Sequence, residues 1–317
     1  MLLGVFVLAV ISPFALRAFR APARESARPE RPFPWWGWLG VAITAIAWVL
    51  AWNRFAWFSG LQPYTFTPLW IGYILTVNAL TYRRTGHCIM RDRPGCFLAL
   101  FPVSAAFWWY FEYLNRYVRN WHYAGVGALE PLEYLVQATL PFATVLPAVL
   151  GTSEWLASFS RLDAAFVGLP RMRLPAARIL APSGLALGCF GLLGVGLWPQ
   201  YLYPVVWMAP VLVLSSLQAL KHEPHVLSGV ARGDWRAVWQ PALAALLCGF
   251  FWEMWNWRSL AHWVYSVPLV HGLPVFEMPL LGYAGYLPFG LTCAAVGFLV
   301  CRYGGTPALA PPRRRDA

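Results

Sequence analysis

Apolar runs of a length that can cross a lipid bilayer recur along almost the whole chain. Nine runs can be marked, and they cover residues 2–16, 35–52, 63–82, 95–115, 133–152, 179–198, 201–220, 239–257 and 278–301. About 20 apolar residues in a helix cross the hydrocarbon layer of a bilayer. A content of 59% hydrophobic and only 12% charged residues agrees with this pattern. The sequence therefore predicts an all-α, polytopic membrane protein with about nine transmembrane helices.

The basic residues predict how these helices are oriented. Nine spans with the N-terminus outside place five segments on the cytoplasmic side, and 20 of the 24 Lys and Arg residues fall in those five segments. Only Arg54, Arg116, Arg119 and Arg258 fall elsewhere. An excess of basic residues on one side is a topology signal, so the net charge of +11 does not indicate a nucleic-acid partner. We expect a multi-pass protein of a bacterial-type inner membrane, with a cytoplasmic C-terminus.

An internal repeat divides the chain. Residues 70–80 (WIGYILTVNAL) align without gaps on residues 207–217 (WMAPVLVLSSL), and a basic loop follows each copy. The alignment predicts four-helix repeats at 35–160 and 161–303, preceded by an N-terminal helix with an Arg/Pro-rich linker at 1–34. Because four is an even number, both repeats start from the same side and are parallel. Residues 304–317 form a basic tail of a composition typical of disorder.

Each repeat carries the same series of polar and aromatic residues at its predicted outer end. The two series are Glu112, Asn115, Trp121, Tyr123 and Glu133, and Glu253, Asn256, Trp263, Tyr265 and Glu277. The first glutamate of each series ends one helix and the second begins the next, so the four carboxylates can converge near the outer face. Acidic residues in apolar surroundings are commonly functional. The alternative is that they are interfacial, with Glu133 and Glu277 stabilising helix N-termini.

Aromatic residues surround both series. The candidates for binding an apolar substrate are Trp109, Trp121, Tyr123, Trp252, Trp263 and Tyr265. Ring faces beside an acid can stabilise a cation, including a transient carbocation. An aromatic belt at the membrane interface is the alternative interpretation of most of these rings.

Three kinds of chemistry fit this set. A carboxylic acid in an apolar site can keep its proton and donate it, while a second carboxylate accepts one, which suits proton-initiated reactions at isoprenoid double bonds. A di-iron bundle would need Glu-x-x-His motifs, whereas Asn stands at both His positions and is a poor iron ligand, so we expect no metal and no cofactor. Transport or binding, with the glutamates carrying protons or cations, remains open.

The histidines and cysteines carry weaker signals. His122, His262 and His271 lie near the glutamates, where they are either acid/base partners or interfacial hydrogen-bonding groups. The six cysteines form no CxxC pair, so neither a disulfide framework nor a zinc site is indicated, and we interpret them as small core residues.

The order Asn, aromatic-x-Tyr, Gly and Pro-x-Glu resembles the repeated motif of the small heterodimeric or fused lycopene cyclases. In the first repeat it is carried by Asn115, Trp121-His-Tyr123, Gly127 and Pro131-Leu-Glu133, and in the second by Asn256, Trp263-Val-Tyr265, Gly272 and Pro274-Val-Phe-Glu277. The resemblance covers about a third of the chain. Tyr134 and Met278 stand where that family has a second acid. The resemblance implies an intramembrane enzyme that modifies carotenoid or other isoprenoid ends.

These observations lead to two functional hypotheses. In the first, the protein binds an isoprenoid, carotenoid-like or lipid substrate between its halves as a cyclase, hydratase or isomerase. Glu253 and Glu277 are acid and base, Asn256 orients one of them, and Glu112, Asn115 and Glu133 are the corresponding candidates. In the second, the protein is a transporter or an accessory subunit that contacts other membrane proteins.

Overall fold

Helices account for most of the structure. The computed structural model describes residues 31–127, 129–172, 177–270 and 272–303, together with 16, 17 and 20. The predicted first span at 2–16 and the tail at 304–317 therefore lie almost wholly outside the described residues. The α-helices are α2 (Trp35–Trp52), α3 (Phe66–Thr85), α4 (Ile89–Asp92), α5 (Pro94–Val118), α6 (Pro131–Phe142), α7 (Val145–Ala157), α8 (Ser160–Ala165), α9 (Ala177–Val195), α10 (Pro199–Leu202), α11 (Val205–Leu220), α12 (Arg236–Arg258) and α13 (Tyr286–Tyr303).

Short elements connect these helices. Four short strands are present in the described chain, namely β1 (Trp121–Ala124), β2 (His262–Tyr265), β3 (Pro274–Val275) and β4 (Met278–Pro279). Single 3-10 turns lie at Ala56–Phe58, Gln62–Tyr64 and Val230–Arg232, and a longer one, η4, covers Leu280–Gly285.

Five helical segments among the described residues are long and apolar enough to cross a membrane. They are Trp35–Trp52, Pro94–Val118, Pro131–Ala157, Arg236–Arg258 and Leu280–Arg302. Two shorter apolar helical segments, Ala181–Val195 and Val205–Leu220, accompany them. The protein is therefore a helical, multi-pass membrane protein.

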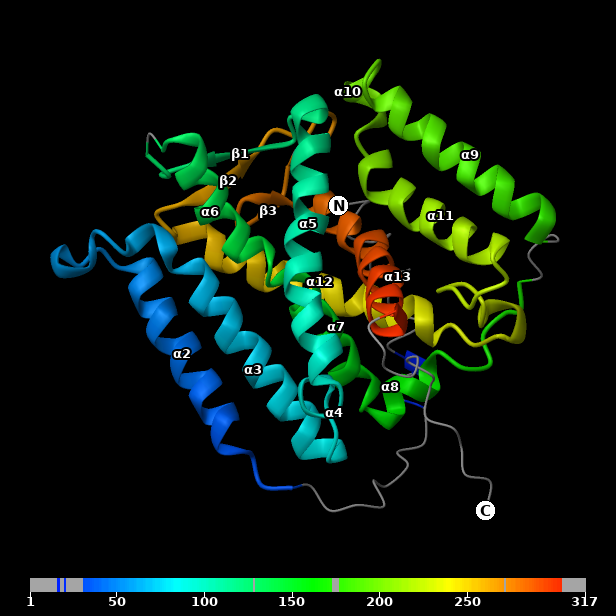
Figure 1. Ribbon diagram of the computed structural model, residues 1–317, viewed down its shortest axis with the longest axis horizontal. Helices are drawn as coiled ribbons and strands as arrows, with labels where there is room; N and C mark the ends of the chain where they lie inside the picture. The colour runs from blue at the N-terminus through cyan, green and yellow to red at the C-terminus, as the bar shows by residue number, and fades with distance from the viewer. Residues whose placement is uncertain are drawn as a thin grey trace.

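The helices pack in corresponding ways in the two halves of the chain (Figure 1). α2 packs along α3, and α9 packs along α11. α3 contacts α7 in the first half, and α11 contacts α13 in the second. Across the halves, α7 packs on α12, and α13 packs on α5. Helices α5, α7, α12 and α13 thus form the centre, with one helix hairpin on each side.

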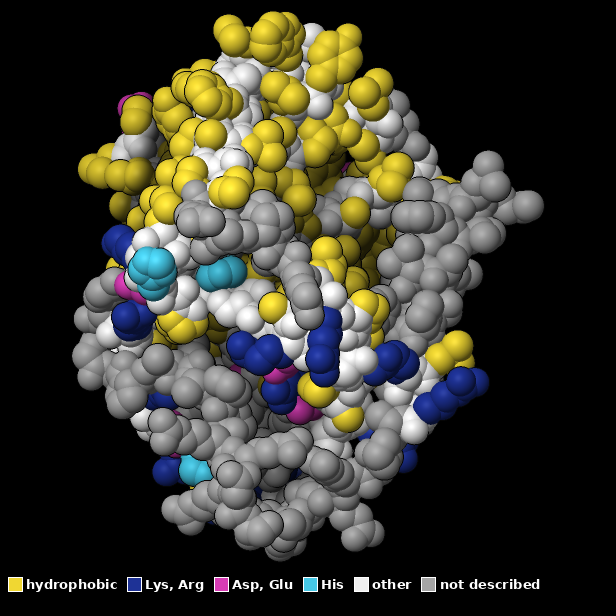
Figure 2. All heavy atoms as spheres, turned by 90° about the vertical axis from the view of Figure 1, so that its right-hand side faces the viewer, with side chains coloured by type: hydrophobic (Ala, Val, Ile, Leu, Met, Phe, Trp, Pro, Cys, Tyr) yellow, Lys and Arg dark blue, Asp and Glu magenta, His cyan; other side chains and the backbone are white. Residues whose placement is uncertain are grey.

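The outer surfaces of these hairpins are apolar. On α2, Trp38 and Ile46 are exposed, and on α9 Leu187, Phe190 and Leu193 are exposed. Figure 2 views the side of the molecule that carries α9, and hydrophobic side chains cover its upper half while basic ones gather below. A large exposed apolar surface is unfavourable in water but matches the lipid side of a membrane protein.

A short two-stranded β-ribbon, formed by β1 and β2, joins the two halves of the chain. β1 follows α5, β2 follows α12, and the two strands pair antiparallel with Trp121 opposite Tyr265 and Tyr123 opposite Trp263. The Trp-x-Tyr segment of each half therefore pairs with that of the other half. Both segments lie between predicted helices, where the all-α prediction included no strand.

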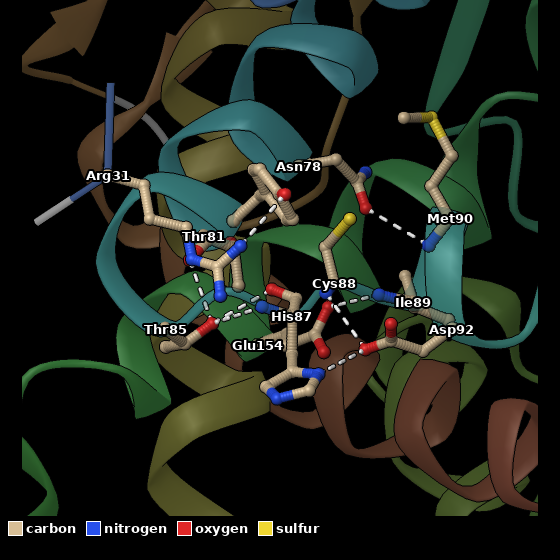
Figure 3. A network of polar contacts seen from close by, with 11 residues as sticks. Arg31, Asn78, Thr81, Thr85, His87, Cys88, Ile89, Met90, Asp92 and Glu154 are labelled. Carbon is tan, nitrogen blue, oxygen red and sulfur yellow. Dashed lines mark hydrogen bonds and ion pairs between the residues drawn. The ribbon is translucent and has the colours of Figure 1, made fainter. Parts of the chain in front are cut away.

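A network of polar contacts lies near the C-terminal ends of α3 and α7 (Figure 3). Glu154 at the end of α7 accepts a hydrogen bond from the Ile89 amide at 2.8 Å. Asp92 accepts from the Cys88 amide at 3.1 Å, and Asn78 on α3 accepts from the Met90 amide at 3.4 Å. Burial raises the pKa of the Cys88 thiol to about 11, so this cysteine stays protonated and unreactive at neutral pH.

Two helix predictions need correction. The run at 133–152 is interrupted between α6 and α7, where the Ser104 hydroxyl donates to the Phe142 carbonyl at 2.6 Å and accepts from the Leu146 amide at 3.0 Å. The run at 278–301 begins with β4 and η4, and its α-helix starts only at Tyr286.

The interpretation of all six cysteines as small core residues needs two corrections, because two of the buried ones form a disulfide and Cys189 is exposed. Cys96 on α5 and Cys301 on α13 form a disulfide, with a Cα separation of 5.0 Å. These residues are 205 positions apart in the sequence, so only the tertiary packing of the two helices reveals the pair. Cys88, Cys248 and Cys293 are buried free thiols.

Candidate functional site

Glu253 is completely buried near the end of α12. Its Oε1 accepts hydrogen bonds from the phenols of Tyr265 at 2.7 Å and Tyr286 at 2.6 Å. The Trp263 indole N–H donates in turn to the Tyr265 oxygen at 2.8 Å. The second carboxyl oxygen of Glu253, Oε2, is buried and has no hydrogen-bond partner among the described residues. The interfacial interpretation therefore fails for this glutamate, because it has no exposed surface.

Glu112 on α5 has an equivalent environment. Its Oε1 accepts from the Trp121 indole at 3.1 Å and from the Tyr123 phenol at 2.6 Å. A third donor is the indole of Trp108, one helical turn earlier, at 3.0 Å. Arg116, four residues after Glu112 on the same helix, is exposed, and the carboxylate bonds to these three rings.

The donor that comes from outside the ribbon differs between the halves for a steric reason: it is Trp108 for Glu112 and Tyr286 for Glu253. Trp108 precedes Glu112 by four residues, and Gly249 precedes Glu253 by four. A Cβ atom at Gly249 would lie 2.5 Å from the ring of Tyr286. The glycine thus leaves the space in which Tyr286, from α13, reaches Glu253.

Asn115 and Asn256 hold the ribbon to the helices. The Asn256 amide donates to the Trp263 carbonyl and its oxygen accepts from the Trp263 amide, both at 2.7 Å. Asn115 likewise donates to the Trp121 carbonyl at 2.7 Å and accepts from the Asn120 and Trp121 amides at 2.9 and 3.3 Å. The prediction that Asn256 orients a glutamate directly is wrong, because its amide group bonds to the strand that carries Trp263 and Tyr265.

A cavity of about 600 Å³ lies beside these groups. Most of its lining is apolar or aromatic, and it includes five of the six predicted substrate-binding residues: Trp121, Tyr123, Trp252, Trp263 and Tyr265. Tyr286, which bonds Glu253, also lines it. The phenols of Tyr265 and Tyr286 therefore connect the cavity to the buried carboxyl group. A mostly apolar cavity with a few placed polar groups is typical of a small-molecule site.

The remaining predicted residues lie elsewhere. Trp109, the sixth predicted substrate-binding residue, does not line the cavity. Its indole N–H donates to the Thr139 hydroxyl on α6 at 3.0 Å. Glu133 is exposed and accepts from the Glu130 amide in a capping box at the start of α6, which matches its alternative interpretation as a helix-stabilising residue. Glu277 is half-buried in the turn between β3 and β4 and interacts electrostatically with Glu253. The four carboxylates thus do not all converge.

The three histidines also differ in placement. His262 lines the cavity, whereas His122 is exposed and His271 lies outside the described residues. In the described chain, His, Cys, Asp and Glu side chains form no cluster of three or more that could hold a metal ion.

Several cavity residues were not identified from the sequence. Tyr286, Trp108, Trp207 and Phe66 line it in addition to the predicted set. Tyr134 and Met278, which directly follow Glu133 and Glu277, line it as well. Trp108 could have been recognised from its position one turn before Glu112, whereas no sequence signal links Tyr286 to Glu253.

The phenols of Tyr123 on β1 and Tyr265 on β2 keep their protons. Burial raises the pKa of Tyr265 well above its usual value, and the charge and hydrogen bond of Glu253 act in the same direction. Burial and Glu112 likewise raise the pKa of Tyr123. Both tyrosines are therefore hydrogen-bond donors at neutral pH.

Comparison of the chain with family models, curated proteins and solved structures returns no match.

Proposed function

We propose that the protein binds an isoprenoid or carotenoid-like substrate in the 600 Å³ cavity and catalyses acid/base chemistry at one of its double bonds. The observation that carries this proposal is the connection from the cavity through Tyr265 and Tyr286 to a fully buried carboxyl group with one unpartnered oxygen. A carboxylic acid in such surroundings can hold a proton for transfer at neutral pH.

In the proposed reaction, the phenol of Tyr265 or Tyr286 turns its O–H from Glu253 toward the double bond and protonates one carbon. The protonated Glu253 passes its own proton to the phenol oxygen in the same step, so that the phenol stays neutral. The neighbouring carbon becomes a carbocation, and the π-faces of Trp252 and Trp263 in the cavity wall stabilise it. Loss of a proton from an adjacent carbon to a base, for which Glu277 is the candidate, restores a double bond. The result is an isomerised product, or a cyclised one if a second double bond of the substrate attacks the carbocation and forms a C–C bond before that proton is lost. Return of the proton from Glu277 to Glu253 restores the starting state.

The proposed membrane arrangement extends the five spans described above. It has nine helices, with the N-terminus outside, the C-terminus in the cytoplasm and two parallel four-helix halves in a bacterial-type inner membrane. The shared packing of the halves and the Trp-x-Tyr ribbon support it. The cavity, which is lined by both halves, then lies toward the outer leaflet.

Product formation in a host that makes acyclic polyenes tests the function. Glu253→Gln keeps the side-chain shape but has no acidic proton to give, so we expect it to abolish conversion while the polyene still binds. Glu112→Gln should be milder, because this carboxylate already accepts three hydrogen bonds. Glu130→Gln, at the exposed start of α6, is the control. Pigment extraction with chromatography and mass spectrometry measures each product.

If Glu253→Gln and Glu112→Gln both convert the polyene like the unmodified protein, the catalytic proposal fails. Stoichiometric membrane-protein partners and no co-purified lipid would instead favour the accessory-subunit hypothesis.

A further inference from the structure

Asn120, between α5 and β1, carries a side-chain amide whose oxygen is unpartnered. The residue is only 3% exposed, and it lines the cavity. Its side-chain oxygen, Oδ1, is buried and has no hydrogen-bond partner among the described residues. A buried amide oxygen of this kind is costly, and most such groups in proteins have a partner. A hydrogen-bond donor in the cavity would remove this cost.

The backbone around Asn120 fixes where this amide lies. The Asn120 N–H donates to the Asn115 side-chain oxygen at 2.9 Å, and the Asn120 carbonyl accepts from the Ser266 amide at 2.8 Å. Asn120 directly precedes β1, and Ser266 directly follows β2. A ligand group that Asn120 binds therefore lies at the end of the ribbon that carries Tyr265, one of the two proposed proton donors.

Gln137 and His262 add two further hydrogen-bond acceptors to the lining. The side-chain oxygen of Gln137, on α6, is buried and has no partner among the described residues. The Nδ1 atom of His262 lies 3.0 Å from the Leu260 carbonyl, which can only accept, so Nδ1 carries the proton. In the neutral ring, Nε2 is then an acceptor. The lining thus favours a ligand that donates hydrogen bonds.

The charges of the lining restrict the head group of the ligand further. No Lys, Arg, Asp or Glu is among the described residues that line the cavity. A phosphate or carboxylate would therefore be buried without a cation, which is strongly unfavourable. An ammonium group could donate to the amide oxygens of Asn120 and Gln137, but it has no acceptor for their N–H groups. A hydroxyl group both donates and accepts, so it matches an amide completely.

We infer that the cavity recognises its ligand by a hydroxyl group, which Asn120 binds, and that the ligand is an isoprenoid chain with this hydroxyl group at one end. The hydroxyl donates to Oδ1 of Asn120 and accepts from the amide N–H. This inference rests on the proposed function and names its substrate class. The double bonds nearest the hydroxyl group are then the ones presented to Tyr265.

Binding of two matched probes tests the inference. Purified protein in lipid nanodiscs is titrated with a fifteen-carbon isoprenoid alcohol or with the hydrocarbon that lacks only its hydroxyl group, and empty nanodiscs give the background. Asn120→Leu removes the amide at a similar side-chain volume, and Gln137→Met does the same on α6. Asn53→Leu, at the exposed end of α2 and outside the cavity lining, is the control. Thermal unfolding verifies that each variant is folded.

The unmodified protein should bind the alcohol about fivefold more tightly than the hydrocarbon. Asn120→Leu should remove this difference by weakening only the binding of the alcohol, whereas Gln137→Met and Asn53→Leu should keep it. Equal Kd values for the two probes in the unmodified protein, a result that depends on no variant, would overturn the inference and leave the proposed function intact. A difference that survives Asn120→Leu but disappears in Gln137→Met would also overturn it. If the unmodified protein binds neither probe, both proposals fail.

Discussion

At the scale of single residues, the position one turn before each buried glutamate determines which ring reaches the carboxylate. Trp108 fills it in the first half and donates to Glu112. Gly249 leaves it open in the second half, and the ring of Tyr286 from α13 occupies the space. The consecutive helices α12 and α13 thus share one hydrogen-bonding centre at Glu253.

The first prediction concerns Tyr286→Phe, which removes one phenol donor from Glu253 and keeps the ring. Because the carboxylate stays buried, we expect a loss of about 1–3 kcal/mol in the free energy of unfolding. Tyr113→Phe is the matched control, since the Tyr113 hydroxyl is exposed and bonds only Tyr117. Denaturant unfolding in detergent measures both variants. Equal losses would contradict a special role for the Glu253 contact.

The second prediction concerns Gly249→Ala. The new methyl group would lie 2.5 Å from the ring of Tyr286, so the ring must move and its bond to Glu253 must lengthen. Overpacking of this kind costs about 1–3 kcal/mol. Gly60→Ala is the control, because a Cβ atom there meets open space. Thermal unfolding compares the two, and an unchanged Gly249→Ala variant would show that the space is not tightly filled.

At the scale of elements, the four-residue strands β1 and β2 depend on the asparagines of the preceding helices. Each strand is too short to be stable alone, and each is held by hydrogen bonds from Asn115 or Asn256 and by the other strand. The ribbon in turn places Tyr123 and Tyr265 against the two glutamates. The conformation of the cavity wall thus depends on two amide side chains.

The third prediction follows from this anchoring. Asn256→Ala leaves the amide and carbonyl of Trp263 without their side-chain partner, which we expect to cost about 1–3 kcal/mol. It should also speed hydrogen exchange at residues 262–265. Asn53→Ala, at the exposed end of α2, removes a similar bond to Val49 and should cost less than about 0.5 kcal/mol. Unchanged exchange in β2 would exclude the anchoring role.

Some of these elements could be predicted from sequence and some could not. Apolar periodicity and length located the helices, because a run such as 35–52 is long and free of charge, and α2 has the same bounds. The break after Phe142 was missed although Pro141 and Pro147 flank it, and a proline removes a helix hydrogen bond. Only the contact that Ser104 makes there from another helix could not be predicted. Glu253, Trp263 and Tyr265 were recognisable because they recur in the first half. Tyr286 was not, because packing alone brings it to Glu253.

At the scale of the whole molecule, the proposed topology makes the fourth prediction. A reporter fused after Arg315 should be cytoplasmic, and one inserted near Gly127, just after β1, should be outside. Paired fusions to a reporter active only in the cytoplasm and to one active only outside measure the two positions. Reversal of either result would exclude nine spans with the N-terminus outside.

The ribbon also has a consequence for assembly. Its register places the Trp of each Trp-x-Tyr segment opposite the Tyr of the other, so the pairing is self-complementary. A strand of this pattern can pair with a second copy of itself about a two-fold axis. Two separate chains, each with one such segment, could therefore pair in the same way, whereas a single chain that carries both segments allows Trp108 and Gly249 to differ.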